Sequence, residues 1–242
     1  MILKDISFLH PQHNLLYDDL LLEQAEQGKS GEVLRIWESP HPFIVLGRIR
    51  KVEEDLFIDQ IVRDGVPVLR RSSGGGTVLQ GKGCLNYTFV LSKEKTPALE
   101  NLHKSYEIIL NKIIQVVDCL GIKAAFRPIS DLVLLEGEKK FSGNAQRRGR
   151  KYILHHGTIL YDFFLPSIEK YLKVPFDLPE YRRKRDHKEF VKNIPITSEQ
   201  FRAAFIDICR VSRVDVQLSQ EEQPLLEELV KKRRVIENLI IL

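Results

Sequence analysis

The stretch RRSSGGGTVLQGKGCLNYTFVLS, residues 70–92, sets three glycines directly before an alternating run of apolar and β-branched residues. Cys84–Leu91 has the pattern of a strand, and Thr77–Leu79 favours a strand as well. Gly74–Gly76 cost backbone entropy on folding, which suits a main chain that lies against a ligand or makes a tight turn. The two arginines at the start could donate hydrogen bonds to a phosphate or a carboxylate. The alternative, from this segment alone, is a hairpin turn with two surface arginines.

Residues 76–83 of this stretch, GTVLQGKG, match the phosphate-loop motif G-x-x-x-x-G-K-[ST] of nucleotide-hydrolysing proteins at all but one position. Gly83 stands where Ser or Thr must supply a hydroxyl to magnesium. The segment also leads into a strand, whereas a phosphate loop opens a helix whose N-terminal N–H groups hold the phosphates. We therefore interpret these glycines as something other than a phosphate loop.

Size and composition are those of an ordinary globular protein. The 242 residues are 43% hydrophobic and 29% charged, and we expect a single domain spanning residues 1–242. The net charge of +4 is too weak to argue for nucleic acid. No apolar run is long enough for a transmembrane helix, and the N-terminus lacks the shape of a signal peptide, which predicts a cytoplasmic protein. Cys84, Cys119 and Cys209 have no paired spacing, so we expect reduced thiols and no zinc site.

Hydrophobic periodicity predicts an α+β fold, with helices packed on one or more antiparallel or mixed sheets. Gly65 is expected to end a helix, Thr197 and Gln200 have the spacing of a capping box, and Ser219 with Glu222 could cap a last helix. Helices are expected at 14–27, 53–63, 98–120, 167–172 and 197–210, with a last one ending near 236. Further strands are expected at 33–37, 43–47, 67–70, 131–135, 140–142, 152–154 and 158–161.

The second chemically dense stretch is ISDLVLLEGEKKFSGNAQRRGRKYILHHGTIL, residues 129–160. Lys140 alternates with apolar neighbours and could point into a pocket, where it would stabilise negative charge on a phosphate or carbonyl oxygen. The alternative is a solvated lysine in a hairpin, beside Lys139. His155 and His156 are adjacent on a strand and face opposite sides, so they do not form a metal-binding pair. We expect one histidine in the core and the other at the pocket.

Together, the two motifs resemble those of the lipoate–protein ligase family, within the wider biotin/lipoate ligase fold. RRSSGGGTV matches the family pattern R-R-x-S-G-G-G-x-V. The second stretch matches D-L-x(4–6)-G-x-K-x-S-G-x-A-x-R followed by H-H-G-T-L-L. The resemblance covers roughly residues 10–195. It implies an α+β catalytic domain with a mixed β-sheet, similar to that of class II aminoacyl-tRNA synthetases.

The resemblance also implies an activity. Family members activate lipoic or octanoic acid with ATP, accompanied by Mg2+, and form an acyl-adenylate and pyrophosphate. They then pass the acyl group to one lysine of a partner, which is a lipoyl domain of a 2-oxoacid dehydrogenase or the glycine-cleavage H protein. The attacking nucleophile comes from the partner, so the ligase needs none of its own.

By match to the motifs, the resemblance implies a site centred on Lys140, which would hold the carboxylate and the α-phosphate oxygens through both steps. Main-chain N–H groups of the glycines would lie near the phosphate. The acyl chain would occupy an apolar tunnel near Leu46, Gly47 and Arg48. The implied adenylate pocket consists of Arg70, Ser72, Ser73, Gly74, Gly75, Gly76, Thr77, Asp131, Ser142, Gly143, His156 and Thr158.

Some features depart from the family pattern. Gln80–Gly81 stands where many members carry His-Asp, and Ser130–Asp131 stands where Asn-Asp is common, which affects one possible metal or ribose contact. The larger bacterial ligases also carry a C-terminal accessory domain. We expect this chain to lack that domain, and so to need a separate accessory chain for activation or to act only in transfer.

A related group, the cysteine acyltransferases, takes octanoate from acyl carrier protein without ATP. Its nucleophilic cysteine precedes the motif lysine, in a region where residues 123–127 of this chain contain none. Cys119 is expected in the core, and nothing near Cys84 in the sequence lowers its pKa. We therefore favour a ligase over a transferase.

An alternative of a different class is a binding protein without catalysis. Residues 181–193 are expected to form a basic loop, and its stretch YRRKRDHK, residues 181–188, could contact RNA. Aromatic side chains for base stacking are sparse there, and charge runs are usually solvated. The loop could equally steer an acidic lipoyl domain toward the site. We therefore expect a protein acceptor, with neither a membrane nor a nucleic acid as partner.

Overall fold

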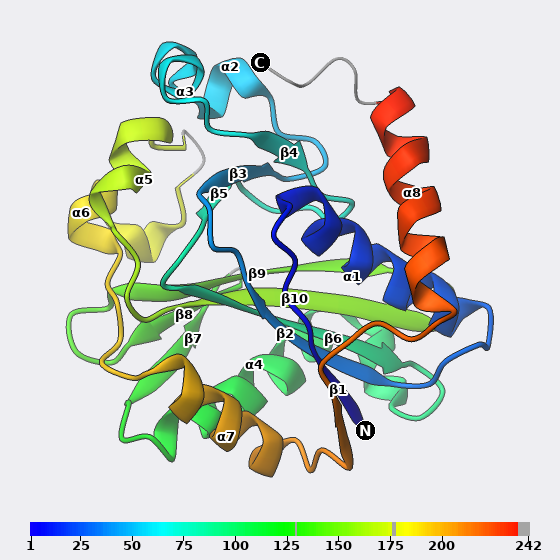
Figure 1. Cartoon of the computed structure of the whole chain (residues 1–242). Helices are drawn as coiled ribbons and strands as arrows, with labels where there is room; N and C mark the ends of the chain where they lie inside the picture. Colours follow the sequence, from blue (N-terminus) through cyan, green and yellow to red (C-terminus); the bar gives the residue numbers. More distant parts are fainter. Residues whose placement is uncertain (129, 176–177, 237–242) are drawn as a thin grey trace.

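The strand that follows the glycines lies in the middle of an eight-stranded sheet (Figure 1). The computed structural model describes residues 1–128, 130–175 and 178–236. β6 (Cys84–Ser92) pairs antiparallel with β2 (Val33–Glu38) on one side and with β10 (Tyr152–Leu160) on the other. The strand order is β11-β1-β2-β6-β10-β9-β8-β7, in which the other strands are β1 (Ile2–Asp5), β7 (Ala124–Arg127), β8 (Asp131–Leu134), β9 (Lys140–Arg148) and β11 (Arg213–Asp215). Because β1 runs parallel to β2 and β11, the sheet is mixed.

A second sheet, of three strands, carries the glycine loop. Its middle strand β3 (Phe43–Leu46) runs parallel to β4 (Val68–Arg70) and antiparallel to β5 (Val78–Gln80). Residues 71–77 therefore leave one edge strand and return along the other. After β5 the chain turns directly into β6, with no helix, so the interpretation against a phosphate loop is confirmed.

Helices cover both faces of the large sheet (Figure 1). α4 (Leu102–Asp118) and α7 (Ser198–Ile208) pack on one face, where Ile109, Ile113 and Phe205 are buried. On the other face, α1 (Pro11–Glu26) and α8 (Glu222–Ile236) pack against each other. The shorter helices are α2 (Val52–Asp55), α3 (Ile58–Asp64), α5 (Pro166–Tyr171), α6 (His187–Phe190) and the 3-10 helices η1 (Pro97–Glu100) and η2 (Glu180–Arg182). The predicted α+β fold with a mixed sheet is confirmed.

The helix ends follow the signals in the sequence. Thr197 Oγ1 accepts a hydrogen bond from the Gln200 amide at 3.2 Å, and the Gln200 side chain accepts from the Thr197 amide at 2.8 Å. Ser219 and Glu222 form the same reciprocal pair at the start of α8, at 3.1 and 2.8 Å. Gly65 adopts the left-handed conformation that ends α3. Each pair satisfies N–H groups that a helix start leaves without an intrahelical acceptor.

Several predicted boundaries were wrong because tertiary pairing overrides the local pattern. The helix expected at 53–63 is split into α2 and α3 at the buried Leu56, which forms a bridge with Leu172. The strands expected at 152–154 and 158–161 are one strand, because β10 pairs with β6 along its whole length. The helix expected from residue 98 begins at Leu102, because Asn101 caps it by accepting from the Lys104 amide.

Other features were not anticipated. The short strands β1, β7 and β11 extend the large sheet at both ends. The expected loop 181–193 contains the C-terminal end of η2 and all of α6. Cys119, expected in the core, lies exposed at the C-terminal end of α4. Among the helices of the described residues, none combines the length and the apolar character needed to span a bilayer.

Candidate active site

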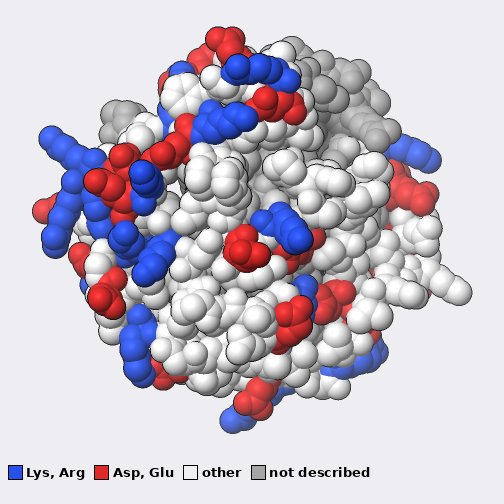
Figure 2. Space-filling model, turned by 60° about the vertical axis from the view of Figure 1, so that its left-hand side comes forward, with Lys and Arg blue, Asp and Glu red and all other residues white. Residues whose placement is uncertain are grey.

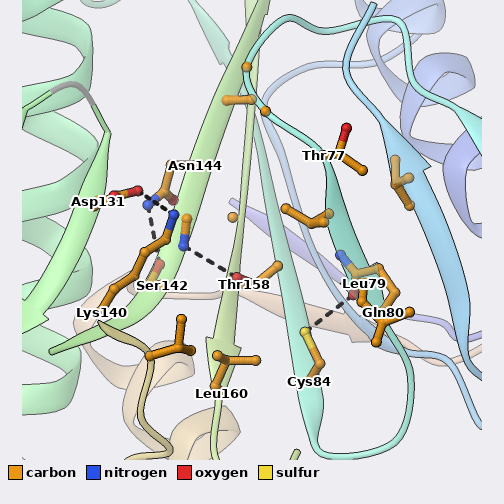
Figure 3. Close-up of a pocket in the computed structure, with 18 of the residues that line it drawn as sticks. Thr77, Leu79, Gln80, Cys84, Asp131, Lys140, Ser142, Asn144, Thr158 and Leu160 are labelled. Atoms are coloured by element: carbon orange, nitrogen blue, oxygen red, sulfur yellow. Dashed lines mark hydrogen bonds and ion pairs between the residues drawn. The ribbon is translucent and has the colours of Figure 1, made fainter. Parts of the chain in front are cut away.

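A cavity of about 240 Å3 opens between the two sheets and the segment from α5 to α6. Strands β8, β9 and β10 supply polar side chains to it, and the segment from the glycine loop through β5 faces them (Figure 3). The predicted site residues that line the cavity are Gly75, Gly76, Thr77, Asp131, Lys140, Ser142, Gly143, His156 and Thr158. The two motifs, which are far apart in the sequence, therefore meet at one site.

Lys140, the first residue of β9, points toward Asp131 at the start of β8 (Figure 3). Lys140 Nζ lies 2.7 Å from Asp131 Oδ1. Asp131 Oδ2 accepts a hydrogen bond from the Tyr181 hydroxyl, so both carboxylate oxygens are engaged. The Lys140 side chain keeps 28% of its surface exposed, so the ammonium is held in place and still open to the cavity. The alternative of a solvated hairpin lysine is therefore excluded.

Arg71 is buried and shapes the glycine loop. Its Nη2 donates to the carbonyl oxygens of Gly74 and Gly76, each at 2.7 Å, and its Nε donates to Ser73 Oγ at 3.0 Å. Burial lowers the pKa of Arg71 to about 10, which leaves the guanidinium charged at neutral pH. Most of the hydrogen-bond donors of Arg71 thus bind the loop itself. The sequence suggested Arg71 only as a possible anion donor, and the structure instead shows a residue that holds the loop in one conformation.

A close approach of two glycines fixes this loop against the end of β3. A Cβ added to Gly47 would lie 2.0 Å from the carbonyl oxygen of Gly75, so no side chain fits there. Gly75 itself has φ 85°, which favours glycine. The Arg48 amide donates to the Ser73 carbonyl at 2.9 Å. Two of the predicted glycines are therefore required by backbone contact and conformation.

Several predicted residues support the loop from behind. Arg70 Nη1 donates to the carbonyl oxygens of Gly47 at 2.9 Å and Arg50 at 2.7 Å. Leu46 is buried in an apolar cluster, and the Ser72 hydroxyl donates to the Asp19 carboxylate. The predicted residues that do not line the cavity are Leu46, Gly47, Arg48, Arg70, Ser72, Ser73 and Gly74. The tunnel expected near 46–48 is thus not part of this cavity.

The adjacent histidines face opposite sides of β10, as expected. His155 is fully buried under α4, and burial lowers its pKa to about 3, so it is neutral at physiological pH. His156 lines the cavity, and its Nε2 lies 2.7 Å from Ser73 Oγ. His156 Nδ1 lies 3.6 Å from Asp18, whose carboxylate is paired with the buried Arg35 at 2.7 Å. The glycine loop is thereby linked to the core of the molecule.

Asn144 is a site residue that the sequence analysis did not single out. Its Nδ2 donates to the Ser130 carbonyl at 2.8 Å and to Ser142 Oγ at 3.2 Å. Next to it, the Gly143 amide donates to Thr158 Oγ1 at 3.3 Å, which joins β9 to β10. Strand alternation places residues 142 and 144 on the same face, and this was the available signal.

Two groups of apolar residues also line the cavity, and they come from different clusters of the core. Leu15, Val45 and Val78 belong to the cluster around Trp37. The second group consists of Leu79, Leu160, Ile168, Leu172, Phe190 and Val191. The cavity can therefore hold a ligand that carries both a charged group and apolar groups.

Cys84 belongs to the second group and lies beside Gln80 (Figure 3). Gln80 Oε1 accepts from the Cys84 thiol at 3.3 Å and from Asn86 Nδ2 at 2.9 Å. Burial raises the pKa of the Cys84 thiol far above its usual range, so the thiol stays protonated. A protonated thiol is a poor nucleophile, and this cysteine is suited to packing.

The charges at the cavity favour an anionic ligand. Apart from histidines and the protonated Cys84, the ionisable groups among the described lining residues are the cations Arg71, Lys140 and Arg182 and the carboxylate Asp131. Within the described part of the chain, no group of three His, Cys, Asp or Glu side chains could hold a metal ion. The protein therefore offers positive charge and hydrogen-bond donors at this centre.

Comparison with known proteins agrees with this geometry. The family model of the lipoyl protein ligase A/B catalytic domain matches residues 10–209, which is most of the chain. The chain belongs to this family. In a member of the lipoyl protein ligase A/B family, the glycine loop and the β8–β10 motif form one site, as the structure shows.

Two relatives illustrate the range of activities in the family. The probable lipoate-protein ligase A of Mycoplasma pneumoniae is 30% identical over 164 residues, which are 68% of this chain and 46% of that protein. The octanoyltransferase LipM of Geobacillus kaustophilus is 25% identical in an alignment of 261 positions, gaps included, which covers 95% of this chain and 93% of that protein. The chain thus spans about half of the ligase relative. Ligases and transferases both occur among its relatives.

Solved structures share the fold. A bi-partite lipoate protein ligase from Thermoplasma acidophilum has a TM-score of 0.77 at 22% identity and covers 95% of this chain and 91% of that chain. A lipoate-protein ligase A bound with ATP also has a TM-score of 0.77, at 20% identity, and covers 95% of this chain and 94% of that chain. At these identities, the likeness establishes the fold of lipoate protein ligases for this chain.

The family motifs do not account for every cavity residue. Arg182 and His187 reach the cavity from η2 and α6, outside both motifs. Sequence reasoning placed them in a solvated basic loop, which was wrong for Arg182, a residue with only 4% of its surface exposed. The signal available was Phe190, whose ring packs under the Arg182 guanidinium.

Proposed function

We propose that this protein joins lipoate or octanoate to a lysine of a carrier protein by way of an acyl-adenylate formed from ATP. The observation that carries the proposal is that cationic side chains and two groups of apolar residues line one cavity. An acyl-adenylate matches this lining, because a phosphate joins an acyl chain to a nucleoside. The lipoate-protein ligase relative and the ATP-bound ligase of the same fold support the choice.

Lys140 would act in both steps of this reaction. In the first, a carboxylate oxygen of the acid attacks the α-phosphorus of ATP, and pyrophosphate leaves. In the second, the partner's lysine amine attacks the carbonyl carbon, AMP leaves with the electrons of the broken C–O bond, and the amine loses a proton. Negative charge develops on oxygen in both transition states, so a fixed ammonium stabilises them more than the ground states. Asp131 keeps that ammonium in place at 2.7 Å.

Magnesium would enter with the nucleotide, because the described residues offer no cluster of ligands for a resident ion. Asp131, the carboxylate at the cavity, already binds Lys140 and Tyr181. When bound to the ATP phosphates, the cation would neutralise part of their charge.

A second candidate is a transferase that takes its acyl group from a carrier thioester or from a lipoyl-adenylate made by an accessory chain. The octanoyltransferase relative, which this chain spans almost fully, favours it. A thioester mechanism through Cys84 is disfavoured, because the thiol is buried, protonated and bonded to Gln80. We therefore place adenylate chemistry first.

The proposed partner is a lipoyl domain of a 2-oxoacid dehydrogenase or a glycine-cleavage H protein. The bi-partite ligase of Thermoplasma acidophilum has an E2 lipoyl domain as its counterpart, which supports this class of acceptor. Figure 2 shows acidic and basic side chains interspersed over one face, with lysines and arginines gathered at one edge. In the basic stretch, Arg182 is buried and Arg185 donates to carbonyl oxygens of Gly137, Glu138 and Tyr181. Two of its five cations are thus engaged within the protein, which makes the stretch less suited to non-catalytic RNA binding.

Intact-mass spectrometry of an apo lipoyl domain tests the choice of donor. The domain is incubated with the protein and lipoate plus Mg-ATP, with octanoyl carrier protein alone, or with preformed lipoyl-adenylate. We expect a lipoyl mass shift with Mg-ATP that Lys140→Ala abolishes and that Lys139→Ala, its neighbour outside the cavity, retains. Modification from octanoyl carrier protein alone would instead establish a thioester transferase. Modification from lipoyl-adenylate alone would show that activation needs a separate accessory chain.

A further inference from the structure

Arg182 is a buried cation at the cavity that the family motifs do not include. It lies in η2, and 4% of its surface is exposed. It lines the cavity together with Lys140 and Asp131. Arginine is rarely buried to this degree without a charged partner, so its surroundings indicate what it binds.

The contacts of the Arg182 guanidinium leave a buried nitrogen without a hydrogen-bond partner among the described residues. Nε donates to the Arg185 carbonyl at 2.8 Å, and the guanidinium carbon lies 4.6 Å from the centre of the Phe190 ring. Nη2 is buried and has no hydrogen-bond partner among the described residues. A buried donor of a cation without an acceptor is costly, because it has lost water and gained nothing in exchange. The guanidinium of Arg182, which lines the cavity, therefore has hydrogen-bonding capacity that the described residues do not use.

Asp131 does not serve as that acceptor. One of its oxygens binds Lys140 Nζ and the other accepts from the Tyr181 hydroxyl. Asp186, in the same segment, accepts from the Glu189 amide at 3.0 Å and caps α6. The nearby carboxylates are therefore engaged with other groups, which leaves the Arg182 guanidinium available to a ligand.

The segment that carries Arg182 is held firmly. Arg185 donates to the carbonyl oxygens of Gly137 at 3.0 Å and Tyr181 at 3.1 Å, and Tyr181 in turn is bonded to Asp131. Arg182 is therefore fixed to the same group that positions Lys140. A preorganised cation costs little entropy when its ligand binds.

The charge balance of the cavity points to a phosphate. Among the described lining residues, Arg71, Lys140 and Arg182 face a single carboxylate, Asp131. A fatty acid alone carries one negative charge, which does not offset this excess, whereas a nucleotide carries more. The planar guanidinium is also suited to phosphate oxygens.

We propose that Arg182 binds a phosphate oxygen of the nucleotide through its guanidinium, as a substrate-binding residue that acts beside Lys140. This inference rests on the proposed function, because it assumes that the cavity takes an adenylate. It assigns a role to a segment outside both sequence motifs.

Calorimetric titration with AMP and with adenosine tests the proposal, because the two ligands differ only in the phosphate. We expect Arg182→Ala to raise the Kd for AMP about 10- to 100-fold, the range for a lost charge-assisted hydrogen bond, and to leave the Kd for adenosine unchanged. Arg182→Lys should fall between, because it keeps the charge and loses the planar donor. Arg183→Ala is the matched control, since the Arg183 side chain is 78% exposed in the same turn.

Other outcomes overturn the proposal. An unchanged Kd for AMP in Arg182→Ala, or an equal loss for AMP and adenosine, would show that Arg182 does not recognise the phosphate. Wild-type protein that binds adenosine as well as AMP, or neither, would do the same.

Acyl transfer from preformed lipoyl-adenylate is measured in parallel on the wild type. If AMP binding depends on Arg182 while transfer is absent, the proposed function fails and the phosphate site stands. If transfer occurs while Arg182→Ala binds AMP normally, only the phosphate site fails.

Discussion

At the scale of single residues, the site depends on how Asp131 holds Lys140. Asp131→Asn keeps the size of the side chain and removes the charge that fixes Lys140 Nζ at 2.7 Å. We expect kcat/KM for acyl transfer to fall about 10- to 100-fold, because displacing a catalytic group by about 1 Å has effects of this size. Steady-state kinetics with a lipoyl domain measure it. Glu136→Gln, an exposed change in the following turn, is the control. Equal rates for Asp131→Asn and the wild type would contradict the role given to this pair.

The cysteines make a second prediction at this scale. Burial raises the pKa of the Cys84 thiol, and it raises that of Cys209 to about 11, while Cys119 is exposed. We expect iodoacetamide at pH 8 to alkylate Cys119 in the folded protein and to spare the other two, as read by peptide mass spectrometry. Cys84→Ala should retain acyl transfer, because the adenylate route uses no thiol. Loss of transfer in that variant, together with a thioester at Cys84 in the wild type, would favour the transferase.

At the scale of elements, the glycine loop is held by backbone contact. In Gly47→Ala the new Cβ would lie 2.0 Å from the Gly75 carbonyl oxygen, so β3 or the loop must shift. We expect the free energy of unfolding to fall by about 1–3 kcal/mol, the usual cost of overpacking, and acyl transfer to fall with it. Gly74→Ala, in the same loop, has no atom within 4 Å of the added Cβ. Urea denaturation should show a change within about 0.5 kcal/mol for that control. Equal stability of the two variants would contradict the packing argument.

Elements were predictable where their signals are local. The capping box of Thr197 and Gln200 and the left-handed Gly65 act through neighbours in the sequence. The break at Leu56 depends on Leu172, and the unity of β10 depends on β6, so neither is visible in a short window.

The site residues also fall into two groups, those that the sequence predicted and those that only the structure shows. The motifs and their resemblance to a known family placed Lys140, Asp131 and His156 at the cavity. The roles of Arg71 and Asn144 are visible only in the structure, where their hydrogen bonds are seen. Arg182 reaches the cavity because the tertiary fold brings η2 next to β8. A residue whose role depends on tertiary contacts cannot be recognised from a short stretch of sequence alone.

At the scale of the whole molecule, Glu222 connects the last helix, α8, to the first strand and the first helix. It is buried, lies 3.0 Å from Lys4 Nζ in β1 and accepts from the Tyr17 hydroxyl of α1 at 2.9 Å. Burial opposes its ionisation, but the Ser219 amide and Lys4 outweigh this, and the pKa of Glu222 is lowered. The stabilisation is therefore present above the ordinary glutamate pKa and is lost as the pH falls through the lower, folded value.

We expect the docking of α8 to weaken in the wild type at acidic pH, below the ordinary glutamate pKa, as the lowered pKa is crossed. Glu222→Gln should weaken docking by roughly 3 kcal/mol at pH 7, because it leaves Lys4 with Asp215 as its remaining carboxylate partner. Hydrogen exchange of the amides around Leu226 and Val230, which α8 buries against α1, measures both effects. Glu228→Gln, an exposed change on the same helix, is the control. Undiminished protection in Glu222→Gln would contradict the anchoring role.

The central claim is that this cavity transfers an acyl group from an adenylate to a partner lysine with the help of Lys140. The most direct measurement is a single-turnover reaction of preformed lipoyl-adenylate with an apo lipoyl domain, followed by intact mass. We predict a lipoylated domain with wild-type protein and with Lys139→Ala, and a rate lowered at least about 100-fold with Lys140→Ala. Equal rates with Lys140→Ala and the wild type, or no lipoylation above the protein-free reaction, would contradict the account.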